Sequence, residues 1–512
     1  MAAKARDRFD MNHLQSGRHS ALFPIVAALI TAFLITGCVV SRSPISGNKR
    51  AYGYTWQQEI ELGTSADEQI VAQFGLYDDP SLTQYVDSVG QALLRISHLK
   101  RNGAEAEWVA TRFHFRILDS PVINAFALPG GFVYVTRGIL AHLESEAQLA
   151  VVLGHEIGHV AGRHASKRAA KQMGGNLVLL GAAVGGQILG GGDIAETILN
   201  VGGAATQLLF LQYGRDDERE SDRLGVEYAS MIGYDAGQAS AFFRTLKRLG
   251  EQSESDIPSF LSTHPDPGAR EETIQLLAAD WAPQYETERI ARGYYLTRVN
   301  DLIFGENPRN GFVRDDRFYH PELAFEFPVP QEYSLLNQAQ QIVLTASDNK
   351  AAILMQIDQN HATAEEASEA FKAQEGINLV EGGIGTANGL SARYVLADAT
   401  NSNGQELRLR AHFIDYDGTV FSFLGMALKE NFGDYDAQFQ SIMRGFRRLT
   451  DQQILSVQPD RIHLVQASQE ASLQSVIPST LPSGITPTGL AILNQLELGD
   501  TLPRGYTLKL VE

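Results

Sequence analysis

The chain has 512 residues, of which 44% are hydrophobic and 20% are charged. These values are ordinary for soluble globular proteins, and they argue against a polytopic membrane protein and against extensive disorder. The formal net charge of -18 gives no support to nucleic-acid binding, which needs basic patches, so we expect no nucleic-acid partner. The length is too great for one hydrophobic core, and we expect an α+β protein with several domains.

The first 37 residues are typical of a signal peptide. Basic residues precede an apolar run from Ala21 to Ile35, which is too short for a comfortable membrane span. The run leads into Ile35-Thr36-Gly37-Cys38, which resembles a bacterial lipobox. The resemblance implies that Cys38 is lipidated and becomes the mature N-terminus, with Met1 and Met11 both open as the start of the chain. A simple secretory signal with a chance cysteine is the alternative.

The residues after the lipobox bear on location. Val39 follows Cys38, whereas an aspartate there resembles an inner-membrane retention mark in Gram-negative bacteria. Its absence favours the outer membrane, if the cell is Gram-negative. Residues 38–55 contain Ser, Gly and Pro and few apolar side chains, so we expect a tether. Cys38 is the single cysteine of the chain, and no intrachain disulfide can form.

Residues 56–285 have the pattern of a mainly helical domain with a small sheet. Apolar spacing predicts helices from Trp56 to His98, which Pro80 divides into two. Alternating residues predict strands at 113–118 and 132–136, the second one after a Pro-Gly-Gly turn. We expect the second strand to expose an edge beside the functional site. An extended substrate could pair with that edge through main-chain hydrogen bonds.

A helix is predicted from Ser145 to His164, and it carries the clearest chemical signal of the chain. Ser145 and Gln148 have the spacing of a capping box. His155 and His159 lie one turn apart, so their imidazoles can present two nitrogens to one tetrahedral zinc ion. Glu156 would lie beside the open position of the metal and could accept a proton from an attacking water. A buried helix whose histidines only hydrogen-bond their neighbours is the alternative.

Three glycines recur every fourth residue on this helix, at positions 154, 158 and 162. Each costs a helix roughly 1 kcal/mol relative to alanine. The repeat therefore predicts that another element approaches the backbone of the helix closely.

A third metal ligand is expected in Glu218-Arg219-Glu220-Ser221-Asp222, at the start of a second helix that continues to Ile232. Glu218 and Asp222 lie one turn apart and share a face, whereas Glu220 faces elsewhere. One of the two can bind metal while the other orients a ligating histidine. A solvated acidic helix start, favoured by the helix dipole, is the alternative.

Several motifs follow one another along residues 55–285: Asn124-Ala125-Phe126-Ala127-Leu128-Pro129-Gly130-Gly131, then Leu153-Gly154-His155-Glu156-Ile157-Gly158-His159, then Glu218-x-x-x-Asp222. In this order they resemble the gluzincin-like zinc metallopeptidase family of HtpX, the CAAX prenyl endopeptidases and BepA. The resemblance implies one Zn²⁺ per chain, held by His155, His159 and Glu218. It implies that Glu156 is the catalytic base, and Asp222 matches the aspartate of the family's active site.

Ser262-Thr263-His264-Pro265, followed by Arg270, resembles the BepA-like members of the family. There the histidine can close over the zinc, so the resemblance implies that His264 is a fourth ligand or latch. An ordinary loop histidine before a proline is the alternative.

The stretch 173–211 is Gly-rich and apolar, and we expect two apolar helices joined by a turn. They could touch membrane or an unfolded client, or pack on the protease core. Neither run is long enough to span a bilayer.

The remainder predicts a connector at 286–310, an α+β accessory domain at 311–450 and a small module at 451–512. The accessory domain offers no paired catalytic residues, so binding or substrate positioning is its expected role. The last module is similar to a LysM-like module, strand-helix-helix-strand, but it lacks the opening Gly-Asp-Thr turn. It could bind peptidoglycan, or it could be a small capping domain.

These expectations combine into one functional hypothesis. The chain is a lipid-anchored, periplasm-facing zinc endopeptidase of the bacterial envelope, with the outer membrane favoured over the inner one. Its substrates are unfolded or misassembled envelope proteins, which makes its role protein quality control. The alternatives are a chaperone-like binding protein on the same fold and a peptidoglycan-associated protein.

Overall fold

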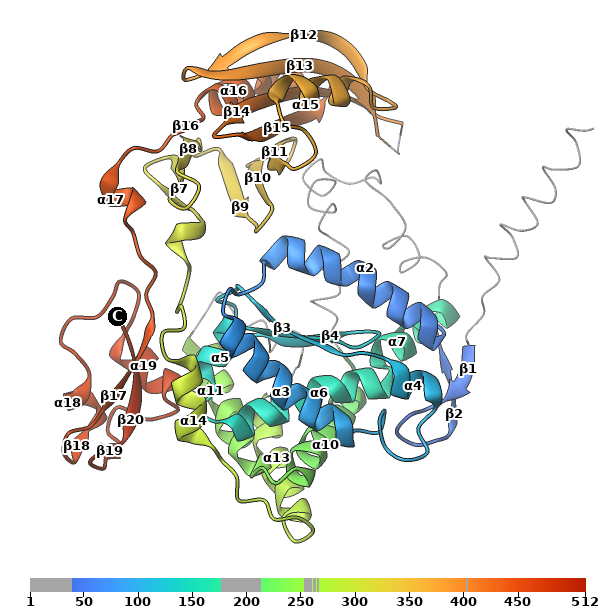
Figure 1. Ribbon diagram of the computed structural model, residues 1–512, viewed down its shortest axis with the longest axis vertical. Helices are drawn as coiled ribbons and strands as arrows, with labels where there is room; N and C mark the ends of the chain where they lie inside the picture. The colour runs from blue at the N-terminus through green and yellow to red at the C-terminus, as the bar shows by residue number, and fades with distance from the viewer. Residues whose placement is uncertain (1–38, 176–212, 253–259, 261–263, 265–266, 402–403) are drawn as a thin grey trace, which may run out of the picture.

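A computed structural model describes residues 39–175, 213–252, 260, 264, 267–401 and 404–512 (Figure 1). The α+β class is confirmed, since a mainly helical part with a small sheet comes first and a sheet-rich part follows. The predicted signal peptide, Cys38 and most of the apolar stretch 173–211 lie outside the described residues. Within the described ranges, no helix has the length and apolar character needed to cross a membrane.

The helical part begins with a two-stranded hairpin, which lies in the segment predicted as a tether. Its elements are β1 (Val39–Arg42), β2 (Lys49–Tyr52), α2 (Trp56–Phe74), α3 (Pro80–Ile96), α4 (Ala106–Ala110), β3 (His114–Leu118), β4 (Ala125–Leu128), β5 (Phe132–Thr136), α5 (Arg137–His142), α6 (Glu146–Gly162), α7 (His164–Gly175), α10 (Arg215–Met231), α11 (Ala239–Gln252), α13 (Pro267–Trp281) and α14 (Arg292–Val299). The break predicted at Pro80 is present, because Asp79 caps α3 and Pro80 is its first residue.

The small sheet has the order β3-β5-β4, with β3 parallel and β4 antiparallel to β5. The strand 132–136 is therefore central, and the prediction that it exposes an edge is wrong. The edge next to the metal helix belongs to β4, which packs against α6 and was not predicted. All four side chains of β4 are buried, so the strand has no alternation that a sequence pattern could reveal.

The helix α6 carries the His155–His159 pair and is buried along its whole length. Ser145 is the N-cap, and its Oγ accepts a hydrogen bond of 3.2 Å from the Gln148 amide. The reciprocal half of the predicted capping box is displaced by one residue, since Gln148 Oε1 accepts from the amide of Glu144 at 2.7 Å. The helix ends at Arg163, whose φ of 53° is left-handed and turns the chain into α7.

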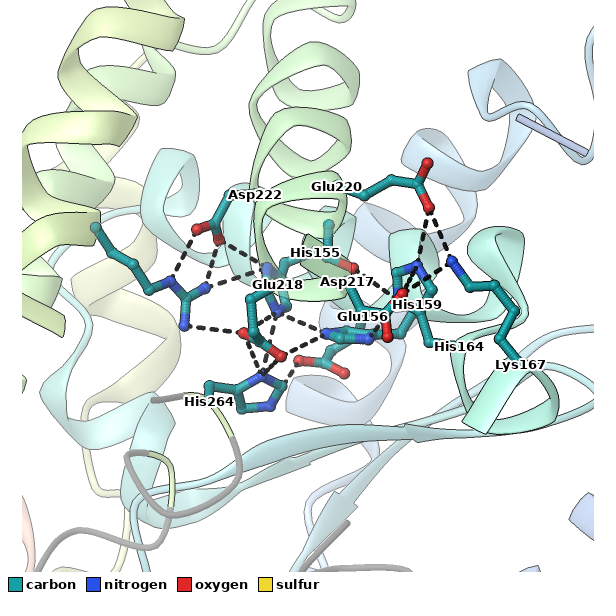
Figure 2. A network of polar contacts seen from close by, with 12 residues as sticks. His155, Glu156, His159, His164, Lys167, Asp217, Glu218, Glu220, Asp222 and His264 are labelled. Atoms are coloured by element: carbon teal, nitrogen blue, oxygen red, sulfur yellow. Dashed lines mark hydrogen bonds and ion pairs between the residues drawn. The ribbon is translucent and has the colours of Figure 1, made fainter. Parts of the chain in front are cut away.

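The glycines of α6 allow α10 to pack directly on its backbone. A Cβ added to Gly154 would lie 3.0 Å from the Cα of Gly225, and one added to Gly158 would lie 3.2 Å from the Cα of Ser221. The predicted close approach is confirmed at these two positions. At Gly162 the neighbour is instead the ring of His164. The packing brings the acidic start of α10 beside the two histidines of α6 (Figure 2).

The sheet-rich part lies at the opposite end of the molecule's long axis (Figure 1). A seven-stranded antiparallel sheet has the order β12-β13-β14-β15-β11-β10-β9, and a four-stranded sheet has the order β16-β8-β7-β6. Their elements are β6 (Phe312–Arg314), β7 (Arg317–His320), β8 (Phe325–Pro328), β9 (Tyr333–Asn337), β10 (Gln341–Ala346), β11 (Ala351–Asp358), α15 (Ala364–Lys372), β12 (Asn378–Ala387), β13 (Leu390–Thr400), β14 (Glu406–Tyr416), β15 (Thr419–Leu428), α16 (Phe432–Arg444) and β16 (Arg447–Arg448). A tight hairpin turn at Asp417 and Gly418 joins β14 to β15.

The C-terminal residues return to the helical part. They form α17 (Gln452–Leu455), β17 (Ile462–Gln466), β18 (Ala471–Ser472), α18 (Leu473–Val476), α19 (Pro487–Leu493), β19 (Thr501–Leu502) and β20 (Thr507–Val511). The predicted strand-helix-helix-strand order is present, with two short strands added. Ile462, Leu490 and Leu510 belong to the same hydrophobic core as Leu149 of α6. The last fifty residues therefore contribute to the core that supports the metal helix.

Candidate metal centre

Four buried side chains from three parts of the chain converge at one point (Figure 2). His155 and His159 come from α6, Glu218 comes from the first turn of α10, and His264 lies shortly before α13. One ligand atom of each residue lies within 4.8 Å of the ligand atoms of the other three. The structure thus brings together all the metal ligands that the sequence suggested.

The spacing of these atoms is that of ligands around one ion. The Nε2 atoms of His155 and His159 are 2.9 Å apart, and each lies 3.4 to 3.6 Å from an oxygen of Glu218. His264 Nδ1 lies 3.2 Å from His155 Nε2 and 3.1 Å from Glu218 Oε2. Nitrogen and oxygen ligands at zinc bond lengths would be about 3.3 Å apart in a tetrahedron. The residues present therefore fit a tetrahedral metal ion.

Burial and the facing side chains set the charge states of His159 and Glu218. Burial lowers the pKa of His159 well below its usual value, so the imidazole stays neutral. Burial alone would raise the pKa of Glu218, but the facing His264 and His159 hold it well below its usual range. A neutral imidazole and an ionised carboxylate are the forms that bind metal.

Glu156 is fully buried beside the cluster, and neither of its carboxylate oxygens has a hydrogen-bond partner among the described residues. His264 Nε2 lies 3.6 Å from Glu156 Oε1 and likewise has no hydrogen-bond partner in the described chain. Burial raises the pKa of Glu156. An orphaned buried carboxylate destabilises a fold, so such a group needs a functional explanation.

Asp222 lies one turn after Glu218 but reaches the outer nitrogen of a ligand rather than the cluster itself. Its Oδ1 is 2.9 Å from His155 Nδ1, and Arg270 Nε donates to its Oδ2 at 2.9 Å. This contact keeps the ring of His155 turned so that Nε2 faces the other ligands. Arg270, from α13, also lies 3.4 Å from Glu218 Oε2. The sequence analysis noted that Arg270 follows His264 but assigned no role to this arginine.

Tyr213 is a residue of this site that the sequence analysis missed. Its ring stacks on the ring of His159, with centroids 4.0 Å apart and planes inclined by 27°. Burial raises the pKa of Tyr213, so its hydroxyl stays protonated. The residue precedes α10 and follows no periodic pattern, and only the fold places it over the histidine.

Residues 80–278 match the sequence model of Peptidase family M48. The matched region is less than half of the chain, and it includes all four residues of the buried His-His-Glu-His cluster, which could hold one metal ion.

Three relatives are similar to about half of the chain. The beta-barrel assembly-enhancing protease of Escherichia coli is 29% identical over 260 residues, which are 50% of this chain and 51% of that protein. The protein of the same name from Yersinia pestis is 31% identical over 274 residues, 48% of this chain and 51% of its own length. The mitochondrial metalloendopeptidase OMA1 of Schizosaccharomyces pombe is 26% identical over 249 residues, 48% of this chain and 67% of that protein. The chain thus spans about half the length of the bacterial relatives.

Proposed function

We propose that the chain is a zinc-dependent endopeptidase of the bacterial cell envelope that degrades misfolded or misassembled envelope proteins. The observation that carries this proposal is the convergence of four buried ligand side chains beside Glu156, whose carboxylate has no hydrogen-bond partner among the described residues. The match of residues 80–278 to Peptidase family M48 supports the reaction class. The bacterial relatives are named for beta-barrel assembly, which supports the envelope as the setting.

Each residue of the site has a role in this proposal. His155, His159 and Glu218 hold the zinc ion, and Asp222 orients His155 through its outer nitrogen. A zinc ion held there supplies a Lewis acid that polarises the scissile carbonyl and lowers the pKa of water. Glu156 accepts the proton of the attacking water and returns it to the leaving amine. Burial raises the pKa of Glu156, which makes its carboxylate a stronger base for the first step.

The edge strand β4 supports binding of an extended substrate. It packs against α6, and its outer side has no strand partner within the described sheet. An added strand would be held mainly by main-chain hydrogen bonds, which impose little sequence preference. Low preference suits an enzyme that acts on many unfolded proteins.

We place the protein at the periplasmic face of a membrane through a lipid on Cys38, with the outer membrane favoured because Val39 follows the cysteine. In this proposal residues 1–37 are the signal peptide and 56–285 are the catalytic domain. Residues 311–450 are the accessory domain, joined by 286–310. Residues 451–512 are the LysM-like module, with peptidoglycan as its candidate ligand. Mass spectrometry of the mature N-terminus tests the anchor, since any N-terminus other than an acylated Cys38 contradicts it.

His264 is proposed as the fourth ligand and latch. Its Nδ1 lies within 3.2 Å of both His155 and Glu218, in the space that water and substrate need. His264→Ala should then raise the rate of proteolysis. A loss of roughly a hundredfold would instead assign His264 to stabilisation of the oxyanion. An unchanged rate would make it an ordinary loop histidine.

The decisive experiment uses the purified mature chain, with zinc content and cleavage of unfolded casein measured on the same samples. We expect one zinc ion per chain and cleavage that a chelator abolishes. Glu156→Gln should lower the rate by roughly 100- to 10,000-fold while zinc stays bound, because the base is lost and the ligands remain. Glu272→Gln, an exposed carboxylate on α13, is the matched control. Undiminished cleavage by Glu156→Gln contradicts the proposal, and bound zinc without any cleavage by the wild type favours a binding protein.

A further inference from the structure

His164 is a fully buried histidine that the proposed mechanism does not use. It is the first residue of α7, immediately after the left-handed turn at Arg163. Its Nδ1 lies 2.9 Å from Nδ1 of the metal ligand His159, and its Nε2 lies 3.0 Å from Glu220 Oε2 (Figure 2). A chain of polar contacts thus runs outward from the metal centre through two imidazoles to a carboxylate.

The direction of the hydrogen bonds in this chain follows from the chemistry of imidazole. A neutral imidazole carries one proton, so His159 with a free lone pair on Nε2 has its proton on Nδ1. That N–H donates to His164 Nδ1, which is then the acceptor. The proton of His164 must therefore be on Nε2, where it donates to Glu220 Oε2. In this arrangement three of the four nitrogens have a matching partner, and His159 Nε2 keeps its lone pair for a metal ion.

The reverse arrangement fails at both ends. If His164 Nδ1 were the donor, the proton of His159 would lie on Nε2, which faces the other ligands 2.9 to 3.4 Å away and would be lost to metal binding. His164 Nε2 would then present a lone pair to the carboxylate of Glu220 at 3.0 Å. The carboxylate of Glu220 therefore selects the tautomer of the metal ligand His159.

The carboxylates at the outer end of this series of polar contacts are themselves held in place by a lysine. Lys167 Nζ lies 2.9 Å from Asp217 Oδ1 and 3.3 Å from Glu220 Oε2. The ammonium group takes the place that a cation would occupy between these carboxylates, so His164, Asp217 and Glu220 do not form a second metal site. The two carboxylates instead face the Nε2 side of His164, at 3.0 and 3.6 Å.

The turn before α7 is built to hold the ring of His164 in this position. A Cβ on Gly162 would lie 2.2 Å from His164 Nε2, so only glycine leaves room for the ring. Arg163 is anchored by a buried ion pair, with its Nε 2.8 Å from Glu59 Oε1, and by stacking over Tyr52 with 3.8 Å to the ring centroid. These contacts place His164 independently of any metal.

We infer that His164 is a positioning residue for the metal ligand His159, relaying the charge of Glu220 and Asp217 to its outer nitrogen. The two histidines of α6 are therefore oriented by different means. Asp222 contacts His155 directly, whereas the carboxylates act on His159 only through the second imidazole. The inference rests on the proposed metal site and adds a residue outside its ligand set.

The test compares two substitutions of His164 in the mature chain. His164→Phe keeps an aromatic ring and removes both nitrogens, and it should weaken zinc affinity roughly 10- to 100-fold in a chelator competition assay. His164→Asn keeps an acceptor near the position of Nδ1 and should recover most of that loss. The visible absorption spectrum of the Co²⁺-substituted protein should change in the Phe variant and stay close to wild type in the Asn variant.

A role in folding alone predicts a different pattern. Both substitutions would then lower the melting temperature of the metal-free protein, while zinc affinity and the Co²⁺ spectrum of the folded fraction stayed unchanged. Wild-type zinc affinity in His164→Phe, or an Asn variant no better than Phe, overturns the inference. If His164→Phe does not fold, Glu220→Ala decides, since its unchanged zinc affinity would also overturn it. A wild-type chain that binds no zinc would instead refute the proposed function on which the inference rests.

Discussion

The two ends of α6 carry buried polar networks that differ in how completely their groups are paired. At the N-terminal end, Lys509 of β20 is fully buried, and three oxygen atoms surround its ammonium group. They are the carbonyls of Ala141 at 2.7 Å and Leu143 at 2.9 Å, and Glu144 Oε1 at 2.9 Å. The other oxygen of Glu144 accepts from Arg292 Nε at 2.8 Å. The two carbonyls accept hydrogen bonds from the lysine, and the carboxylate of Glu144 balances its charge as an ion pair.

At the metal end of the same helix the pairing is incomplete. Both oxygens of Glu156 and Nε2 of His264 have no hydrogen-bond partner among the described residues. A fully paired buried network stabilises one packing arrangement, whereas a partly paired one costs stability and is retained for another reason. The N-terminal end of α6 therefore stabilises the fold, whereas the metal end keeps polar groups, unpaired within the described chain, that are available for a reaction.

The largest effect is expected at the metal end. Glu218→Gln removes the charged ligand from the cluster, and zinc affinity should fall by more than the roughly 100-fold that loss of a supporting residue costs. Casein cleavage should be lost with it. Chelator competition measures the affinity, with Glu272→Gln as the control. Zinc affinity within tenfold of wild type would remove Glu218 from the ligand set.

The paired end should respond in stability instead of metal binding. Lys509→Met removes one partner of a buried ion pair, and the free energy of unfolding should fall by about 4 kcal/mol. Zinc affinity of the folded protein should be unchanged. Urea denaturation measures the loss, with Lys429→Met as a control at a more exposed ion pair, where less than about 1 kcal/mol is expected. If Lys509→Met lost zinc but kept its stability, the N-terminal network would support metal binding and not the fold.

Local pattern was enough to predict α6 and the placement of its histidine pair. The capping serine, the apolar face and the His155–His159 spacing are all set within one helix, as is the shared face of Glu218 and Asp222 on α10. Even the approach of α10 could be predicted, because Gly154 and Gly158 are costly unless another backbone needs the space. The metal-ligand and catalytic roles, and the domain boundaries, stay predictions.

What the sequence could not show depends on contacts between distant segments. Lys509 stands in an alternating strand between Leu508 and Leu510, a pattern that predicts an exposed lysine, yet it is fully buried. The pairing partner of His164 lies 56 residues away on another helix. The strand β12 was also missed, because its glycines and mostly exposed side chains give no buried alternation. Such positions are decided by tertiary neighbours.

A substitution between the two ends tests how far the packing of α10 controls the metal site. A Cβ on Gly225 would lie 2.8 Å from the Val151 carbonyl oxygen and 2.9 Å from the His155 amide nitrogen. Backbone atoms cannot move aside, so Gly225→Ala should cost about 3 kcal/mol of unfolding free energy, the upper part of the range for overpacking.

The same substitution should weaken zinc binding, because α10 carries Glu218. Gly293→Ala on α14 is the matched control, since nothing lies within 4 Å of its added Cβ. Equal stabilities of the two alanine variants would show that α6 and α10 tolerate wider spacing.

The smallest effect concerns the paired end and depends on pH. His142 of α5 is buried and donates from Nδ1 to the Gly138 carbonyl at 2.8 Å, and burial lowers its pKa to about 4. In the unfolded chain its pKa is about 6.5, so the unfolded state takes up a proton first as the pH falls. The stability that neutral His142 contributes is therefore complete above pH 6.5 and is lost progressively between there and about pH 4. Linkage gives a loss of about 1.4 kcal/mol between pH 7.5 and 5.5.

His142→Asn keeps a donor to the carbonyl but cannot titrate, and its unfolding free energy should fall by that much less over the same interval. The comparison isolates one histidine, because His98, His320 and His412, whose pKa values are also lowered to about 4, titrate equally in both proteins. If the unfolding free energies of the two proteins changed with pH in the same way, the pKa of His142 would not be lowered in the folded state.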